Sequence, residues 1–373
     1  GVGQVAAAGH VLAERQHRGR ARRRRRWPRC WPARRGRPAG GAPRYPTSAS
    51  RLLCHHAGSA RTLTGLRIAI PTHLSPGTFA GRHRAGMVTE LSGPTMGTSW
   101  SARIVDAPSG CAAVIGDVLA RVIAQMSNWE AQSDISRFNA QPVGTWTSLP
   151  SDMMTVLRAG LDVARLSEGA FDPAVGRLVE RWGFGPSGIT GPLTVQSPVS
   201  PWTNIEINGG KARRLADVAL DFSGIAKGFA VDAVAQALRD LGVPNFLVEI
   251  GGELRGEGVR PDLQPWWVDV EAPPGLTIPV LRIALCNLAA ATSGDYRRFR
   301  NEGGRLLSHS IDPATGGPVG NDVASVTVLH ETAMLADAWA TAITVAGPER
   351  GMTLATRENL AAHLVLRTPQ GAK

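Results

Sequence analysis

The order of helical and extended patterns after residue 87 constrains the fold of this chain most strongly. Apolar and polar residues alternate over residues 98–105, as in a half-buried strand, and residues 111–130 place apolar side chains at helical spacing. Further helical patterns cover 151–169, 224–242 and 332–347, and extended patterns cover 245–250, 266–273, 281–292 and 323–330. Ser151 is expected to be the N-cap of its helix. Because helices and strands follow in mixed order, we expect an α+β fold with mixed sheets and packed helices rather than a doubly wound parallel sheet.

Residues 1–86 differ in composition from the rest of the chain. They contain eighteen Arg, no Lys and one acidic residue, Glu14, whereas the remaining residues carry 23 basic and 29 acidic side chains. The formal net charge of +11 therefore comes from this first segment. A segment rich in Arg, Gly and Pro buries too little apolar surface to offset its ordering entropy, so we expect residues 1–86 to be disordered.

Met87 directly precedes the first ordered pattern. We expect translation to start there, with one globular domain over residues 87–365. The Arg cluster leaves a nucleic-acid or membrane-surface arm as the less favoured alternative. The sequence has no convincing signal peptide and no run of about 20 apolar residues. These features predict a cytoplasmic protein, or a periplasmic, membrane-anchored one if a wrong start site hides a signal.

Two smaller features limit the possible architecture. Residues 186–204 are rich in Pro, Gly and Ser, which predicts a surface insertion. The four cysteines show no paired spacing, so neither a disulfide framework nor a zinc site is expected.

Two helical segments carry candidate ligand groups. Asp337 and Thr341 are four residues apart, so they share one helix face and offer oxygen ligands of the kind that Mg²⁺ prefers. A capping or solvated face is the alternative. In "LDFSGIAKGFAVD", Asp221 ends an extended run, and Lys227 lies in the first turn of the following helix. Such a helix start can bind phosphate, although an ordinary capped helix fits the same pattern and the phosphate-loop spacing is missing.

Several loops carry further polar groups. Asp172 lies in one Asp-Pro turn and His309 just before another, "SHSIDPATGGPV". Each residue could contact a ligand or only stabilise its turn. Gly251-Gly252 follows a buried strand and permits a close approach of another backbone or a ligand.

Eight segments stand in the order typical of one known family. They are "GPTMGTSW", "MSNWEAQSDISRFN", "GAFDPAVGRLVERWGFG", "LDFSGIAKGFAVD", "IGGELRGEG", "ATSGDYRRF", "SHSIDPATGGPV" and "ADAWATA". From about Leu91 to about Gly347, the chain resembles the FAD:protein FMN transferase (ApbE) family. The resemblance implies a Mg²⁺-dependent enzyme that takes FAD as substrate. Such an enzyme transfers FMN to a Thr or Ser of a target flavoprotein and releases AMP.

The resemblance also assigns residues by position. His309 matches the histidine proposed to activate the target hydroxyl. The positions that match metal ligands are Asp337, Thr341 and the backbone carbonyl of Gly224. The positions that match FAD contacts are Met96, Trp129, Ala170, Phe171, Asp172, Asp221, Lys227 and Ile311. The chain departs from the family pattern at Glu249 and Glu253, where Asn and Asp are common.

Two other functions remain open at this point. In a Mg²⁺-dependent FAD pyrophosphatase, water would replace the protein hydroxyl at the same site. A flavin-binding protein without catalysis would need no nucleophile, and the presence of His309, Asp337 and Thr341 argues against it.

Overall fold

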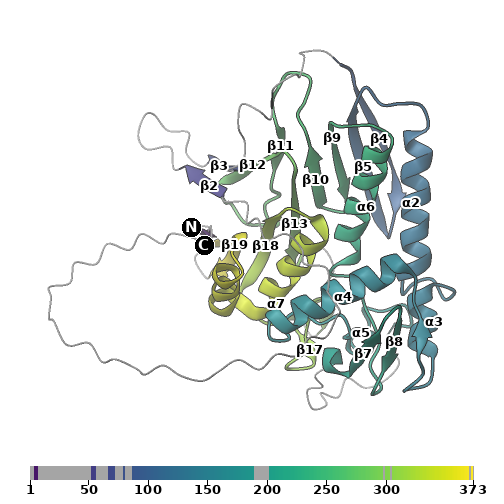
Figure 1. Ribbon diagram of the computed structural model, residues 1–373. Coiled ribbons are helices and arrows are strands. Elements are labelled where there is room, and N and C mark those ends of the chain that lie inside the picture. Colours follow the sequence, from purple (N-terminus) through teal and green to yellow (C-terminus); the bar gives the residue numbers. More distant parts are fainter. Residues whose placement is uncertain are drawn as a thin grey trace, which may run out of the picture.

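The computed structural model describes residues 4–6, 52–55, 66–71, 79, 86–188, 201–296, 299–302, 305–368 and 371–372. Within these residues, a nine-stranded antiparallel sheet runs through the molecule (Figure 1). Its strands in spatial order are β1 (Gln4–Ala6), β19 (Ala361–Thr368), β18 (Val323–His330), β13 (Leu288–Gly294), β10 (Glu253–Glu257), β9 (Phe246–Ile250), β5 (Thr98–Val105) and β4 (Val88–Thr95), and β20 (Gly371–Ala372) pairs with β19. The expected α+β class is confirmed.

Three helices pack on one face of this sheet: α2 (Cys111–Met126), α6 (Ala226–Asp240) and α7 (Ala333–Arg357) (Figure 1). A smaller sheet packs on the opposite side. It has the strand order β11 (Trp266–Asp269), β12 (Val280–Leu285), β3 (Leu66–Pro71) and β2 (Leu52–His55), with β12 and β3 parallel.

The two-residue period of the strands explains this layered arrangement. In β13, Ala289 and Ala291 belong to the core beneath the helices, whereas Leu288 and Ala290 belong to a second core with residues of the small sheet. Successive side chains of a strand point to opposite faces, so one apolar run supplies both cores. The large sheet therefore has little free face left in its centre.

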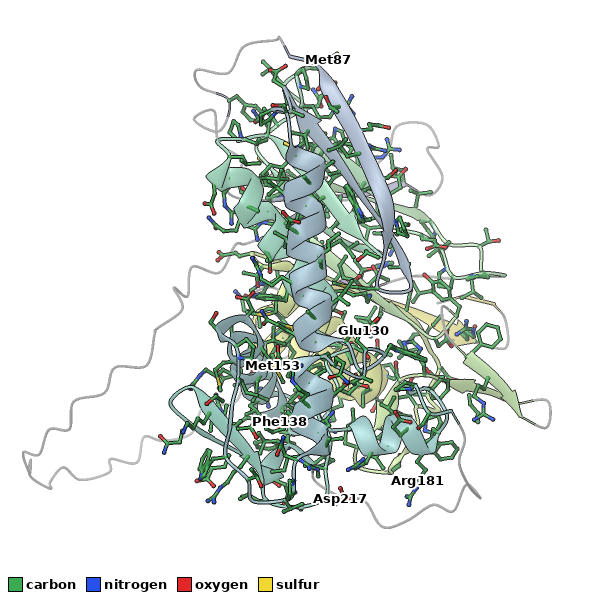
Figure 2. The ribbon with its side chains drawn as sticks, turned by 90° about the vertical axis from the view of Figure 1, so that its right-hand side faces the viewer. Met87, Glu130, Phe138, Met153, Arg181 and Asp217 are labelled. Atoms are coloured by element: carbon green, nitrogen blue, oxygen red, sulfur yellow. The ribbon has the colours of Figure 1, made fainter. Side chains whose placement is uncertain are left out.

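A lobe beside the main sheet contains α3 (Asp134–Ala140), α4 (Ser151–Leu166), α5 (Gly176–Arg181), the 3₁₀ helix η1 (Pro201–Asn204), and a sheet of β6 (Thr147–Ser148), β8 (Lys211–Arg214) and β7 (Ile205–Asn208). Figure 2 shows Met87 at one end of the molecule and Phe138, Met153 and Asp217 in this lobe at the other, with Glu130 between them. Two short hairpins complete the described chain, β14 (Phe299–Glu302) with β15 (Arg305–Ser308) and β16 (Ile311–Asp312) with β17 (Gly317–Pro318).

Two expected features differ from the structure, and a third element continues past its predicted end. Residues 281–292 do not form one strand, because a left-handed turn at Asn287 (φ 52°) separates β12 from β13. Ser151 is the first residue of α4, whose N-cap is Pro150. The helix predicted over 332–347 leaves helical geometry at Gly347 (φ 79°), as predicted, and a second helical segment from Pro348 extends α7 to Arg357.

Most of residues 1–86 and the centre of the 186–204 insertion lie outside the described residues, so these expectations stay predictions. Three strands in the described part of residues 1–86 are exceptions to the expected lack of structure: β1 pairs with β19, and β3 pairs with both β2 and β12 and buries Ala69. The domain boundary at residue 87 also stays a prediction. Among helices of the described chain, none combines the length and apolar character that crossing a membrane requires.

Candidate active site

The start of α7 is fixed by side chains that satisfy its free N–H groups. The Asp232 carboxylate, from α6, accepts hydrogen bonds from the backbone N–H of Ala333 at 3.0 Å and of Met334 at 2.9 Å. The Thr332 hydroxyl accepts a bond from Leu335 N–H at 3.4 Å. A carboxylate at this end also complements the helix dipole. These bonds hold α7 against α6, and α7 carries both Asp337 and Thr341.

Thr341 and Gly224 approach each other closely. A Cβ placed on Gly224 would lie 2.9 Å from Thr341 Oγ1 and 3.4 Å from the Phe171 ring, so a side chain there would have to displace a neighbour. The Ser293 hydroxyl, at the end of β13, lies 3.1 Å from Thr341 Oγ1. The predicted pair of Gly224 and Thr341 is therefore brought together in space, with Ser293 as a third oxygen group.

Asp337 is buried one helical turn before Thr341, with a relative exposure of 4%. Its Oδ2 accepts a hydrogen bond from Gly228 N–H at 3.1 Å. Burial raises the pKa of Asp337, while the Lys227 charge and the Gly228 N–H act in the opposite direction. A buried carboxylate with few partners is a group that a cation would stabilise.

Lys227 forms an ion pair with Glu253, the first residue of β10. Lys227 Nζ lies 2.5 Å from Glu253 Oε1, and the Glu253 side chain is only 1% exposed. Burial raises the pKa of Glu253 to about 7, although the Lys227 ammonium favours the charged form. Glu253 Oε2 is buried and accepts no hydrogen bond from any residue that the structure describes.

Residues Ala170, Phe171 and Asp172 form a buried segment between α4 and α5. Both carboxylate oxygens of Asp172 accept backbone N–H groups, from Ala174 at 2.7 Å and from Trp202 at 3.0 Å. Burial raises the pKa of Asp172 to about 7, against the effect of these two donors. In this structure Asp172 organises its own turn, and its contact with FAD stays a prediction.

Asp221 lies beside the same segment. Its backbone N–H donates to Pro173 O at 2.9 Å, and its Oδ1 accepts a bond from Ser223 N–H at 2.8 Å. Asn128 donates through Nδ2 to Leu220 O at 3.3 Å, which places the neighbouring Trp129 near this loop. Trp129 itself is 59% exposed, an unusual position for so large an apolar ring.

A cavity of about 540 Å³ adjoins Asp221 within the lobe. Asn128, Asn139, Arg177, Glu180 and Arg214 contribute polar groups to its wall. Asn139 fixes the strand-like segment before Asp221 by accepting a bond from Leu220 N–H at 2.7 Å and donating to Leu220 O at 2.9 Å. The predicted metal residues do not line this cavity.

His309 follows β15 and is half-buried. The Phe184 ring meets its imidazole edge-to-face, with 6.5 Å between ring centroids. Trp182 Nε1–H donates to Gly316 O at 2.8 Å, so the segment after α5 also holds the following turn. That turn closes with Gly316 N–H on Asp312 O at 2.8 Å, as the Asp-Pro and Gly-Gly-Pro pattern predicted. Ile311 is buried on β16.

Met96 occupies the tip of the β4–β5 hairpin, with a left-handed backbone (φ 48°) and a half-buried side chain that packs against the main core. The next strand begins at Thr98, whose Cγ2 would lie 2.9 Å from a Cβ on Gly251. The hairpin therefore lies against the Gly251-Gly252 turn and close to Lys227.

The described contacts gather the predicted residues into two groups. Gly224, Lys227, Asp337 and Thr341 lie where β13, α6 and α7 meet, and the hairpin that carries Met96 lies beside Lys227 at the Gly251 turn. His309 and Ile311 lie in the turns that Trp182 and Phe184 support. α5 connects the groups, because Gly176 N–H at its start donates to Ala219 O at 2.8 Å, close to Asp221 in the chain.

Sequence reasoning gave no definite role to three residues that the structure places here. Ser293 lies in "ATSGDYRRF", which counted only as one of the eight segments of the family resemblance. Glu253 stood directly after Gly-Gly but counted only as a departure from a family pattern. Asp232 carried no signal, because its partners are backbone groups of a helix a hundred residues away in the chain.

Comparisons with known proteins agree on one family. The ApbE family model matches residues 96–364. FAD:protein FMN transferase of Haemophilus influenzae is 36% identical over 326 residues, covering 82% of this chain and 93% of that protein. FAD:protein FMN transferase of Vibrio cholerae is 36% identical over 309 residues, covering 79% and 92%.

A solved structure shows the same architecture. The crystal structure of Pseudomonas stutzeri flavinyl transferase ApbE, apo form, matches with a TM-score of 0.71 and 35% identity, covering 77% of this chain and 93% of that one. Flavin transferase ApbE from Vibrio cholerae matches with a TM-score of 0.69 and 35% identity, covering 78% and 96%. The chain therefore belongs to the ApbE family.

Proposed function

We propose that the protein is an FAD:protein FMN transferase, which moves FMN from FAD to a Thr or Ser hydroxyl of a target flavoprotein and releases AMP. The observation that carries the proposal is the meeting of Asp337, Thr341 and Gly224 beside the Lys227 ammonium. This arrangement occurs in a chain that is 36% identical to an enzyme of that name over 93% of its length. The Lys227 ammonium, and a cation held by these oxygen groups, would stabilise the anionic pyrophosphate of FAD.

The oxygen groups of the site fit a Mg²⁺ ion. Asp337 supplies a buried carboxylate, Thr341 a hydroxyl and Gly224 a backbone carbonyl. Hard cations such as Mg²⁺ prefer oxygen ligands and keep several waters, so one carboxylate is sufficient. No cluster of three His, Cys, Asp or Glu side chains suited to a metal occurs among the described residues, so the proposed site depends on one carboxylate together with hydroxyl and carbonyl oxygens. A bound Mg²⁺ would neutralise the phosphate oxygens and the departing AMP.

His309 is the proposed general base. It takes the proton of the acceptor hydroxyl while the acceptor oxygen forms a bond to the phosphorus of the FMN half. The bond between that phosphorus and the bridging oxygen breaks, and AMP leaves with the electron pair. General-base catalysis of this kind contributes about 10²–10⁴-fold to a rate. The Phe184 ring and the closed Asp312–Gly316 turn restrict where the imidazole can lie.

Lys227, together with the other proposed FAD contacts, binds and orients the substrate. The exposed Trp129 ring offers a flat apolar surface for one of the FAD ring systems. Phe171 and Asp172 are buried, and backbone N–H groups hold both Asp172 oxygens, so these two residues help to define the shape of the site.

The test uses the full chain with FAD, Mg²⁺ and a panel of candidate flavoprotein acceptors. Mass spectrometry follows the gain of one FMN on the acceptor, and chromatography follows AMP. We expect acceptor labelling by the wild type, and its loss in both His309→Ala and Asp337→Asn. Asp162→Asn, on the exposed side of α4, is the matched control and is expected to keep full activity.

Two outcomes would contradict the proposal. AMP and free FMN without labelling of any acceptor would identify a pyrophosphatase. Labelling that persists in both site variants would remove His309 and Asp337 from their assigned roles.

A further inference from the structure

Burying the Glu253 carboxylate costs the folded protein free energy. Its side chain is 1% exposed, one carboxylate oxygen pairs with Lys227, and the other has no partner among the described residues. A buried ion pair is commonly no more stabilising than apolar residues of the same size, because both charges lose their hydration. A buried carboxyl oxygen without a hydrogen bond adds a further cost. Stability alone therefore does not account for Glu253.

The turn before Glu253 is shaped to bring it to Lys227. Gly251 and Gly252 both have left-handed backbones, with φ of 60° and 102°. A Cβ on Gly251 would lie 3.6 Å from Lys227 Cδ and 2.9 Å from Thr98 Cγ2. Because Gly251 has no side chain, the aliphatic part of Lys227 can lie across the turn, and its ammonium reaches Glu253, the first residue of β10.

The ammonium has a second acidic neighbour. The residue after Lys227, Gly228, donates its N–H to the buried Asp337 at 3.1 Å, and, although burial raises the pKa of that carboxyl, the Lys227 charge acts to lower it. Without an anchor, a lysine side chain has four rotatable bonds and many accessible positions. With Glu253 fixed at the start of a central strand, the ammonium has a defined place beside Asp337.

We propose that Glu253 is a positioning residue, which holds the Lys227 ammonium at the phosphate-binding end of the site. The phosphate-binding role of Lys227 rests on the proposed function, whereas the anchoring of Lys227 by Glu253 does not. Glu253 acts through Lys227 and touches neither FAD nor the acceptor. Replacing it with Gln keeps the shape and a hydrogen-bond acceptor but removes the charge that fixes the ammonium.

The first test measures the position of Lys227 without any turnover. The chain has three lysines, Lys211, Lys227 and Lys373. Brief acylation with an N-hydroxysuccinimide ester, followed by peptide mass spectrometry, gives the rate at Lys227 relative to the exposed Lys211 on β8. We expect this ratio to rise about tenfold in Glu253→Gln, the equivalent of losing one charge-assisted hydrogen bond. Glu249→Gln, a carboxylate-to-amide change on the neighbouring strand, should leave it unchanged.

The second test separates binding from catalysis. In Glu253→Gln, we expect the kcat for FMN transfer to fall about tenfold or more, because the ammonium no longer keeps its orientation. The Kd for FAD, measured by fluorescence in EDTA, should change by less than about threefold, since the cation itself remains. Glu253→Asp keeps the charge on a shorter stem and should recover part of kcat. Thermal unfolding of each variant shows whether it is folded.

The outcomes are distinguishable. An unchanged acylation ratio at Lys227 in both Glu253 variants would overturn the proposal. So would a kcat that falls only in proportion to lost stability, with no recovery in Glu253→Asp. If the wild type transfers no FMN to any acceptor, the proposed function fails, and the acylation ratio still decides whether Glu253 anchors Lys227.

Discussion

An alanine at Gly228 tests the close approach of α6 and α7 on which the proposed site depends. A Cβ at this position would lie 2.2 Å from Ala333 O, 2.6 Å from Ala333 C and 2.8 Å from Met334 Cα. All three atoms belong to backbone, so no side chain can rotate away. The helices would have to separate by roughly 1 Å to restore ordinary contact distances.

Two opposing effects set the magnitude. Alanine is a better helix former than glycine by about 0.8–1.0 kcal/mol. Overpacking costs about 1–3 kcal/mol, and the rigid neighbours place Gly228→Ala near the upper end. We therefore expect a net loss of about 2 kcal/mol in the free energy of unfolding. The separation also lengthens the bond from Gly228 N–H to Asp337 Oδ2, so FMN transfer should fall at temperatures where the variant is folded.

The matched control is Gly116→Ala in α2, where the added Cβ meets nothing within 4 Å. Only the helix-propensity effect acts there, so this variant should gain up to about 1 kcal/mol. Urea unfolding followed by tryptophan fluorescence measures both variants, and the expected gap is about 3 kcal/mol. If Gly228→Ala is as stable as Gly116→Ala, the backbone contact between α6 and α7 does not exist as described.

Three further predictions concern other groups. Burial lowers the pKa of His363 to about 4, so the protein loses stability as the pH falls below the ordinary value near 6.5. At pH 5 this loss is about 2 kcal/mol, and urea unfolding at pH 5 and 7 should show it removed in His363→Gln. Ser293→Ala should weaken Mn²⁺ binding, measured by electron paramagnetic resonance, about tenfold through Thr341; unchanged affinity would contradict the link. Lys227→Met leaves Glu253 buried without its counter-charge and should cost about 3–5 kcal/mol in unfolding free energy, which Glu253→Gln in the same chain should partly restore.

The local patterns of the sequence predicted most of the elements. Strands β5 and β18 have the predicted bounds, and helices α2, α4 and α6 lie within the predicted ranges. These predictions depended on periodicity, which is a local property of the chain. The N-cap of α4 is Pro150 rather than Ser151, and the main error fell at Asn287, whose left-handed backbone separates two apolar strands. A single left-handed residue leaves almost no trace in apolar spacing.

The site was only partly accessible to sequence reasoning. The pairing of Asp337 with Thr341 followed from helical spacing, and the turn after His309 followed from its Pro and Gly residues. The remaining assignments came from the resemblance to a family, because each signal was weak alone. The ion pair of Lys227 with Glu253 could not be predicted, since it joins two elements 26 residues apart in the chain. The pair can form because Gly251 has no side chain where the Lys227 stem passes.

By itself, the sequence determined which segments become helices and strands, that the fold is α+β, and the family to which the chain belongs. Only the tertiary structure decided that Gly224, Ser293 and Thr341 meet, and that a carboxylate from α6 holds the start of α7. The physical reason is the range of the interactions. Periodicity and turn chemistry act over a few residues, whereas a site forms from groups that packing brings together from distant parts of the chain.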